Sequence, residues 1–547
     1  MEAENLLRNV LEISLFFANL SGLTINYQKS VVIWLGSKKN NDERFLRDKN
    51  FTWDPGGPDN TRFKYLGIWF STNIELITQI NLENKLTEIS KICNIWKKRS
   101  LTPYGKITVL KTLALSKLTY IFMNLPDPNQ DFLKRLDSIF YQFLWDGKPG
   151  KIAKDHMNMS KENGGFNMIN VFDYVSCLKI GLFKKMLLDE EMKTLLLKMY
   201  PMLQNICTLG YVFFDKLIDN IPNQFWCDIC KHVKRLLIKK TPDNYDDIVS
   251  EFIFYNKNIL VNNEIVFYRN WLQNDIFQIQ HLLNNDGTFM NYNAFRGKYP
   301  NVRSNFLQYQ GLVNSIKNYI AGQNVSEKDI NDVQEPIGWR TLRGSKKDIR
   351  EELKKQPNKH ISMIKWDNQF GTLNWNRIFM KCYKTTIDVK LRWFQMRLLY
   401  RVLPTNRLLH IKRIKDNDMC NFCQTTIQTI PHLFWDCPHV VIFWRNLNDT
   451  FIHKLPHAQN LQLSKDLVLF GYKDNVYMDK PMDLFILLAK YHIYSCKMSN
   501  NFPSGHVFLK LFKYRYKLEK LNMYNPDNNY DKFNLDWMPY TSILEQV

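Results

Sequence analysis

Residues 420–437 are CNFCQTTIQTIPHLFWDC, and this stretch carries the most specific chemical pattern in the chain. Cys420 and Cys423 are separated by two residues, and His432 and Cys437 follow. A two-residue gap lets both thiolates turn onto one ion, and a later His and Cys complete a tetrahedral shell that leaves no position open for water. The stretch therefore predicts a structural zinc site that organises the fold around it.

Two alternatives to this ligand set stay open in the sequence. His439 could replace His432 as the nitrogen ligand, and the four side chains could be buried together without a metal. The aromatic residues near the site can stack on nucleic-acid bases, although packing is the expected role of most of them. These aromatic residues are Phe422, Phe434, Trp435, Phe443 and Trp444.

The charge of the whole chain is strongly positive. Its 547 residues include 74 Lys and Arg against 53 Asp and Glu, which gives a formal net charge of +21. With 45% hydrophobic residues the composition excludes global disorder, and the length predicts about three or four domains. The charge excess points to a polyanionic partner, either nucleic acid or an anionic membrane surface.

Two windows, residues 91–126 and 389–415, contain Lys and Arg but no acidic residue. Each interleaves its cations with apolar residues, so a helix can pack one face and offer charge to phosphates with the other. A simply solvated helix face is the alternative. From the second window we expect phosphate contacts by Arg392, Arg397, Arg401, Lys412 and Arg413.

The sequence also limits where the protein works. No stretch approaches the roughly 18–20 apolar residues that a membrane-spanning helix needs. The first residues carry acids where a secretory signal needs positive charge, and 10 cysteines are too few for a disulfide scaffold. We therefore expect an intracellular protein of the nucleus or cytoplasm, neither secreted nor membrane-bound.

Local patterns divide the chain into a short mixed segment and a long helical one. Residues 2–20 have helix-periodic apolar positions and Gly22 as a stop, which predicts an amphipathic helix. Residues 23–26, 31–35 and 63–70 are β-prone runs. From residue 71 onward the pattern is mainly helical, with further β content expected around the zinc run.

Three other motifs suggest chemistry but lack necessary partners. Cys227, Cys230 and His232 have metal-like spacing, yet no second pair completes a shell, so a buried helix face is expected. Residues 245–247 are Tyr-Asp-Asp without the intervening residue of the polymerase motif, and they are expected to begin a helix. Residues 480–483 offer a single acid without the partners of a nuclease site.

Several segments taken together resemble LINE-type non-LTR retrotransposon reverse transcriptases. Residues 21–30, SGLTINYQKS, and 63–70, FKYLGIWF, look like the last two palm motifs in order and spacing. Residues 96–120, with LTPYGK at 101–106, resemble the thumb, and FLWDGK at 143–148 with GGF at 164–166 resembles the segment beyond it. The zinc run with HLFWDCP at 432–438 looks like the family's C-terminal zinc-binding domain.

The resemblance also implies that the magnesium-binding aspartates of the family are missing from this chain. In that family the magnesium-binding aspartates precede the motif matched at residues 21–30, and this chain begins after them. Without carboxylates to hold Mg²⁺, nucleotidyl transfer loses its main electrostatic stabilisation. We therefore expect no autonomous polymerase activity and no catalytic residue, with magnesium bound only if an upstream palm is present.

Individual positions also acquire family roles through the resemblance. Lys29 matches the motif lysine that assists pyrophosphate departure and is expected to be vestigial here. The primer-grip turn matches Tyr65, Leu66 and Gly67, and the thumb cations that clasp the template and primer match Lys97, Lys98, Arg99, Lys106 and Lys111.

The expected fold class is α+β and helix-dominant, with a partial reverse-transcriptase palm. The expected segments are the end of the palm at 1–70, a helical thumb at 71–145, a helical connector at 146–360, a zinc-binding domain at 361–450 and a helical tail at 451–547. The first β segment has lost its sheet partners under this reading and exposes an edge.

Three functional hypotheses follow. The chain is a C-terminal reverse-transcriptase portion that binds RNA or DNA without synthesising it, or the truncated gene model of a complete active enzyme. The third hypothesis is a stand-alone zinc-containing nucleic-acid-binding protein or a decayed element.

Overall fold

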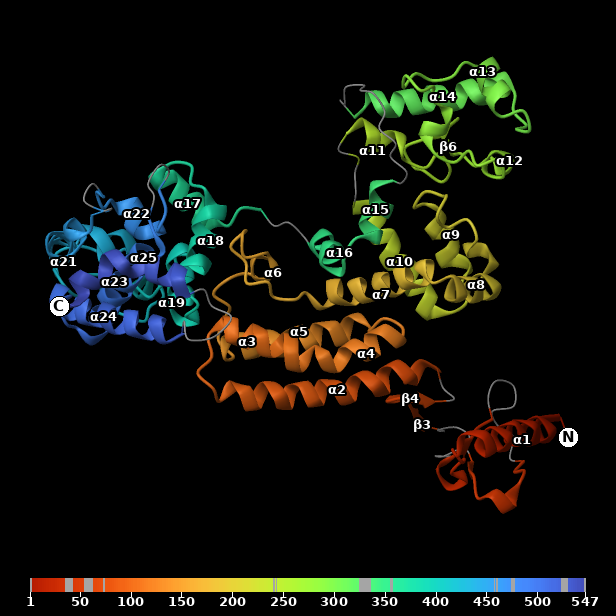
Figure 1. Ribbon diagram of the computed structural model, residues 1–547, viewed down its shortest axis with the longest axis horizontal. Helices are drawn as coiled ribbons and strands as arrows, with labels where there is room; N and C mark the ends of the chain where they lie inside the picture. The colour runs from red at the N-terminus through yellow and green to blue at the C-terminus, as the bar shows by residue number, and fades with distance from the viewer. Residues whose placement is uncertain are drawn as a thin grey trace. The chain divides into compact units, whose positions relative to one another are not determined.

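The computed structural model consists mainly of helices with three small two-stranded sheets, which confirms the helix-dominant α+β class (Figure 1). The structure describes residues 2–34, 43–53, 62–71, 74–239, 242, 244–323, 336–354, 358–456, 458, 461–473, 478–522 and 530–545. The chain divides into two compact units, each built from several stretches of sequence. Unit 1 comprises residues 1–94, 112–139 and 171–353, and unit 2 comprises 95–111, 140–170 and 354–547. Each unit thus combines stretches from several of the five expected segments.

Unit 1 begins with helix α1 (Glu2–Ser21), which ends at Gly22 with a φ of +73° as the sequence predicts. Strand β1 (Val31–Val32) pairs in parallel with β2 (Thr52–Trp53), and β3 (Arg62–Tyr65) pairs antiparallel with β4 (Ile68–Ser71). The predicted strand at 23–26 is wrong, because these residues form no ladder and lead into a 3-10 turn at Tyr27–Lys29. The predicted single run at 63–70 is instead a hairpin.

The rest of unit 1 is helical around two cores. Packing of α7 against α10 builds the first core, which includes Ile180, Phe183 and Leu236. The second core gathers around Trp271, Phe254 and Tyr309, and it lies beside an unpredicted hairpin of β5 (Leu260–Val261) and β6 (Glu264–Ile265). The helices that lie wholly or mainly in unit 1 are α2 (Ile74–Lys97), α4 (Ser116–Asn124), α5 (Gln130–Trp145), α7 (Val171–Leu188), α8 (Glu190–Met199), α9 (Phe213–Asn220), α10 (Gln224–Lys239), α11 (Tyr245–Val249), α12 (Arg269–Leu272), α13 (Tyr292–Lys298), α14 (Phe306–Ala321), α15 (Ile337–Arg343) and α16 (Lys346–Leu353).

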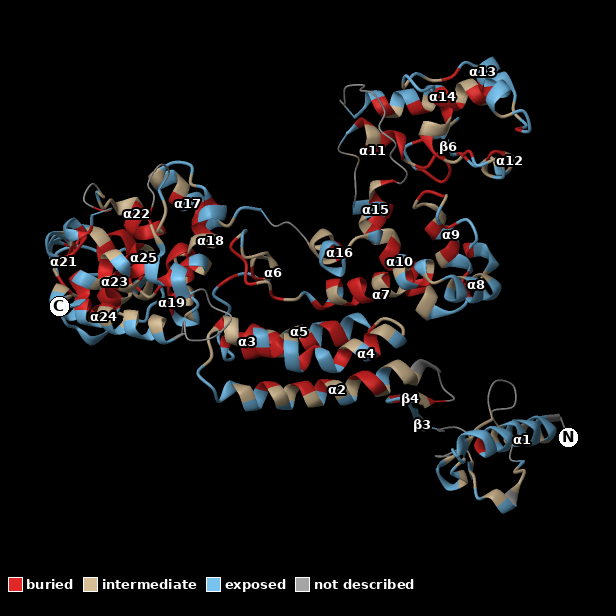
Figure 2. Cartoon of the chain, viewed as in Figure 1, coloured by how far each residue is buried: buried red, intermediate tan, exposed pale blue. Residues whose placement is uncertain are grey.

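Unit 2 is organised around helix α23 (Lys480–Ser499), whose residues are mostly buried (Figure 2). Its long apolar sequence can be enclosed because α18, α19, α22, α24 and α25 all contact it. The other helices of unit 2 are α3 (Pro103–Val109), α6 (Lys154–Asn158), α17 (Ile361–Phe370), α18 (Trp375–Thr385), α19 (Val389–Leu399), α20 (Asn406–Ile411), α21 (Pro438–Thr450), α22 (Lys465–Phe470), α24 (Gly505–Asn522) and α25 (Tyr530–Glu545). A π-helical turn, η7 (His432–Asp436), also contacts α23.

The β content expected around the zinc run is wrong for the described residues. There the backbone forms one isolated antiparallel bridge, Met419 to Ile427, and then enters η7. The bridge closes the loop that contains Cys420 and Cys423, and no strand pairing longer than this forms around them in the described part of the chain. None of the described helices is long and apolar enough to cross a bilayer.

Candidate metal centre and basic patch

The four predicted ligands of the zinc run converge in unit 2. The ligand atoms of Cys420, Cys423, His432 and Cys437 all lie within 4.8 Å of one another. Cys420 and Cys437 are almost fully buried, and His432 is 5% exposed. Such a group of three thiols and one imidazole could hold a metal ion.

The distances within this group fit a tetrahedral ion. The sulfurs of Cys420 and Cys437 are 3.9 Å apart, and the Cys423 sulfur lies 3.4 Å from Nε2 of His432. Metal–ligand bonds of about 2.0–2.3 Å in a tetrahedron place the ligand atoms roughly 3.6–3.8 Å apart. The backbone between the ligands therefore already has the geometry that such an ion requires.

Polar groups around the Cys420 sulfur favour its thiolate form. The hydrogen bond shared by Cys420 and Cys437 lowers the pKa of the Cys420 thiol, with further donation from backbone N–H groups, whereas the same hydrogen bond and burial raise the pKa of Cys437. The Phe422 N–H lies 3.4 Å from the Cys420 sulfur, and the side chain of Gln428, which is fully buried, donates to it at 3.7 Å. Outer donors of this kind orient metal ligands and stabilise their charge.

The metal loop also anchors neighbouring elements of unit 2. The Asn406 side chain, at the start of α20, donates to the Met419 carbonyl at 2.5 Å, and Arg407 pairs with Asp418 at 2.8 Å. Asn421 donates to the side chain of Asn500, the residue that caps α23, at 2.7 Å. Loss of the ion would therefore disturb both α20 and the end of α23.

The alternative nitrogen ligand lies elsewhere. The ring of His439 is exposed and packs on Phe502 with ring centroids 4.6 Å apart, and it is not part of the convergent group. His432 occupies the position because η7 carries it inward from the turn before α21.

The three motifs expected to lack a functional site have structural contacts. His232 lies 2.6 Å from Asp127, and Cys227 donates to the Ile218 carbonyl, so both belong to the packing of α10. Asp247 pairs with Arg340, and Asp483 pairs with Lys381 at 2.6 Å. Burial raises the pKa of Asp483 to about 7.

The positions matched to the primer grip form a tight hairpin turn. Leu66 and Gly67 join β3 to β4 with φ values of +45° and +86°, and only at the second position does glycine make the positive value free of steric cost. Tyr65 and Leu66 are largely exposed, at 61% and 72%. Lys29 is exposed at the end of its 3-10 turn.

The thumb-matched cations differ in their availability. Lys97, Lys98 and Arg99 are exposed at the end of α2 and just after it. Lys106 is 3% exposed and pairs with Asp146 at 2.6 Å, so this cation is engaged within unit 2, and its expected phosphate contact remains a prediction. Lys111 is half-buried in the π-helical turn η4 (Leu110–Ala114).

The second basic window is also partly used for packing. Arg392 donates to the carbonyls of Thr386 and Tyr383, which closes the turn before α19. Arg401 lies over the Trp366 ring, 3.7 Å from its centroid, and donates to Gln369 at 2.7 Å. Arg392 and Arg401 thus have structural contacts, and their expected phosphate contacts remain predictions.

The remaining cations of this window join a second group that sequence reasoning missed. Desolvation and the charges of Arg397, Lys412 and Lys148 lower the pKa of Lys151. Part of the Lys151 side chain nevertheless remains exposed to solvent. Among the described residues, Lys148, Lys151 and Lys412 form no ion pair. We call Lys148, Lys151, Arg397 and Lys412 the basic patch. Arg413 is exposed directly after Lys412.

The loop that carries Lys148 and Lys151 is fixed in place. The Tyr141 hydroxyl donates to the carbonyl of Ile152 at 3.0 Å, and the Ile152 side chain is buried. A Cβ at Gly150 would lie 3.0 Å from the Tyr141 ring and 3.3 Å from the Trp145 indole nitrogen, so glycine permits the close crossing. The sequence gap of about 250 residues between the loop and α19 hid this grouping.

No protein-family model matches the chain.

Proposed function

We propose that this chain binds nucleic acid through unit 2, with the basic patch as the principal phosphate contact. The observation that supports it is that the charges of Arg397, Lys412 and Lys148 lower the pKa of Lys151, and that none of the three lysines forms an ion pair with a described acidic residue. Unpaired cations held close together raise one another's energy, and phosphates relieve this repulsion while releasing counterions.

Zinc is the proposed ion of the metal centre. Three sulfurs and one imidazole nitrogen form a donor set that zinc prefers, and the closed arrangement suits a structural rather than a catalytic ion. When bound, the ion would cross-link the chain and would have a structural rather than a catalytic role. Its role in binding is to hold α20, and therefore Lys412, in position.

The sequence resemblance supports a more specific proposal, that this chain is the C-terminal portion of a LINE-type reverse transcriptase. Supporting features are the order of the matched motifs, the exposed turn at Leu66 and Gly67, and the metal centre within HLFWDCP. The uncovered apolar face of α1 is compatible with a larger palm that would cover it. In this proposal the chain contributes binding, because nucleotidyl transfer requires magnesium-binding carboxylates.

The test is a salt-dependent binding measurement on the full chain. Fluorescence anisotropy with a labelled RNA and the DNA of the same sequence gives the dissociation constant over a series of salt concentrations. A triple variant, Lys148→Gln, Lys151→Gln and Lys412→Gln, is compared with wild type. We expect affinity to fall at least about tenfold near physiological salt, and the slope against log salt to decrease by about 2–3.

A matched control removes the same charge elsewhere in unit 2. The variant Lys454→Gln, Lys510→Gln and Lys517→Gln changes three exposed lysines that lie outside the basic patch. We expect it to lose at most about threefold in affinity. Equal losses in the two variants, or tighter binding of wild type to phosphatidylserine vesicles than to either nucleic acid, would contradict the proposal.

A further inference from the structure

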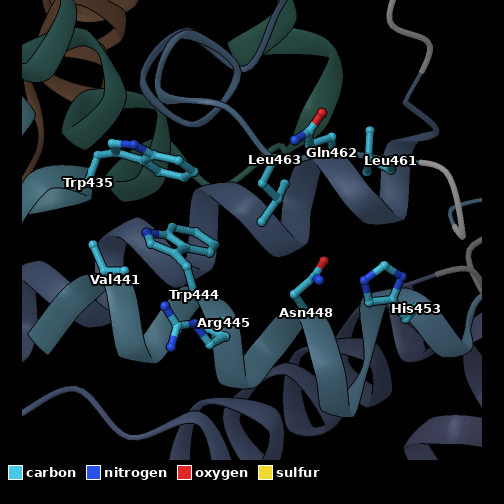
Figure 3. A pocket seen from close by; sticks show the side chains of 9 residues that line it. All are labelled: Trp435, Val441, Trp444, Arg445, Asn448, His453, Leu461, Gln462 and Leu463. Atoms are coloured by element: carbon cyan, nitrogen blue, oxygen red, sulfur yellow. The ribbon is translucent and has the colours of Figure 1, made fainter. Parts of the chain in front are cut away.

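A pocket of about 510 Å³ lies beside the metal centre and is not used by the basic patch (Figure 3). Its volume is within the range of roughly 300–1,000 Å³ that is typical of small-ligand sites. Two indoles lie on the same side of it, and polar side chains follow along α21 and the turn after it. The residues that carry the argument are Trp435, Trp444, Arg445, Asn448, His453 and Leu463.

The two indoles are held by the neighbours of the metal ligands. Trp435 belongs to η7, directly between the ligands His432 and Cys437, and the Cys437 N–H donates to the His432 carbonyl across it. The indole N–H of Trp444 donates to the Phe434 carbonyl at 2.8 Å. A π-helical turn often marks a functional site, because its wider backbone turns a side chain outward.

The indoles differ in exposure. Trp444 is 4% exposed and forms an inner wall, whereas Trp435 is half-buried and has no ring contact with another described residue. The ion pair between Asp436 and Lys465, at 2.6 Å, fixes the backbone next to Trp435. The flat face of Trp435 is therefore held in place and left available for stacking.

The polar lining indicates the charge of the ligand. No hydrogen bond or ion pair joins the side chains of Arg445, Asn448 and His453 to any described residue. None of the described residues that line the pocket carries a carboxylate. A planar group between apolar walls, joined to an anionic group that reaches Arg445, satisfies all of these features. A nucleotide has this chemistry, because every base offers a π-face and carries a phosphate nearby.

We propose that this pocket binds one unpaired base of a single-stranded nucleic acid, stacked on Trp435, with Arg445 at its phosphate. Asn448 offers both a donor and an acceptor to the edge of the base. The proposal deepens the nucleic-acid binding proposed above and rests on it. It adds a preference for single strands, since a base within a duplex cannot enter such a pocket.

The experiment compares a labelled single-stranded dodecamer of thymidine or adenosine nucleotides with a blunt duplex of the same length. Anisotropy is measured for wild type, Trp435→Ala, Trp435→Phe and Arg445→Ala at one salt concentration. We expect Trp435→Ala to weaken single-strand binding about tenfold, Trp435→Phe at most about threefold, and neither to alter duplex binding. Ile442→Ala, an exposed position on α21 outside the pocket, is the matched control and should bind like wild type.

The metal content of each variant is measured, because Trp435 lies between two ligands. Arg445→Ala lies away from the metal, so a threefold to tenfold loss of single-strand affinity there supports the pocket independently. If Trp435→Ala with full metal content binds single strands as wild type does, the pocket proposal is overturned while patch-dependent binding stands. If wild type binds neither probe, the proposed function itself fails. Displacement of the single strand by a tryptophan-rich peptide, but by no mononucleotide, would instead assign the pocket to a protein ligand and overturn the proposal.

Discussion

Helices α1 and α23 are both 20 residues long, yet they differ completely in their surroundings. In α1 the only buried residue among those described is Ala18, and apolar side chains such as Ile13 and Leu20 are 69% and 74% exposed. In α23 most residues are buried (Figure 2), and Lys490 is among them. The contrast shows that a helix-periodic pattern predicts a helix without predicting what covers it, because burial depends on distant parts of the chain.

The largest effect expected is on the α23 region when the metal ligands are removed. Cys420→Ser combined with Cys423→Ser should abolish metal binding and the cooperative unfolding of unit 2, because structural zinc contributes on the order of 10 kcal/mol to small sites. Hydrogen exchange followed by mass spectrometry should show lost protection in α20 and the end of α23, with α1 unchanged. We expect nucleic-acid binding to weaken in parallel.

His439→Ala is the control for this double variant. It should retain one metal ion per chain, since the imidazole of His439 packs on Phe502 and lies outside the ligand group. Full metal content and full protection in the double serine variant would contradict the assignment of the centre.

A pair of identical substitutions tests the contrast between the helices directly. Ile493→Ala in α23 removes a fully buried side chain and should lower the free energy of unfolding of unit 2 by about 2–5 kcal/mol. Ile13→Ala in α1 should change stability by less than about 0.5 kcal/mol. Denaturant unfolding measures both, and a large loss from Ile13→Ala would indicate that α1 is covered in solution.

Stability should depend on pH through the buried lysine of α23. Burial lowers the pKa of Lys490 from 10.5 to about 7, while its Nζ donates to the Gln395 side-chain oxygen at 2.7 Å and to the Leu469 carbonyl at 3.2 Å. Between pH 7 and about 10 the unfolded chain therefore binds the proton and the folded chain does not. The free energy of unfolding should rise with pH in this window, by at most about 1.4 kcal/mol per unit from this group.

Lys490→Met should flatten that rise, and Lys510→Met, at an exposed position, should leave it unchanged. Thermal unfolding between pH 6.5 and 9.5 measures the slopes. Identical slopes in wild type and Lys490→Met would show that Lys490 keeps an ordinary pKa.

The smallest effect is expected in the hairpin near α1. Gly67→Ala should destabilise the turn by about 1 kcal/mol, because its φ of +86° disfavours any side chain. Gly297→Ala, in helix α13 with open space around it, should stabilise by about 0.5–1 kcal/mol. A lower thermal midpoint for Gly67→Ala and a higher one for Gly297→Ala would confirm that the backbone conformation of the glycine decides the effect. Shifts of the same sign in both variants would contradict it.

Local patterns in the sequence predicted the features that depend on a few neighbouring residues. Helix α1 and its stop at Gly22 followed from periodicity and the conformational freedom of glycine. The convergence of Cys420, Cys423, His432 and Cys437 occurs within 18 consecutive residues, through the bridge from Met419 to Ile427 and the π-helical turn η7. The strand expected at 23–26 failed because a β-prone run needs a partner strand, and the chain supplies none there among the described residues.

Features that join distant segments required the structure. The fold of unit 2 buries Lys106 against Asp146, although Lys106 and Lys97 lie in the same window that lacks acidic residues. It also gathers Lys151 with Arg397 and Lys412.

The sequence by itself determined the helix-rich class, the strong positive charge and the candidate status of Cys420, Cys423, His432 and Cys437 as metal ligands, because composition and short-range spacing can be read without the fold. The tertiary structure alone decided which cations are held in ion pairs, which apolar helix is enclosed and that Trp435 lines a pocket. The physical reason is that burial and electrostatic neighbours depend on packing between segments, and a one-dimensional pattern does not encode which segments meet.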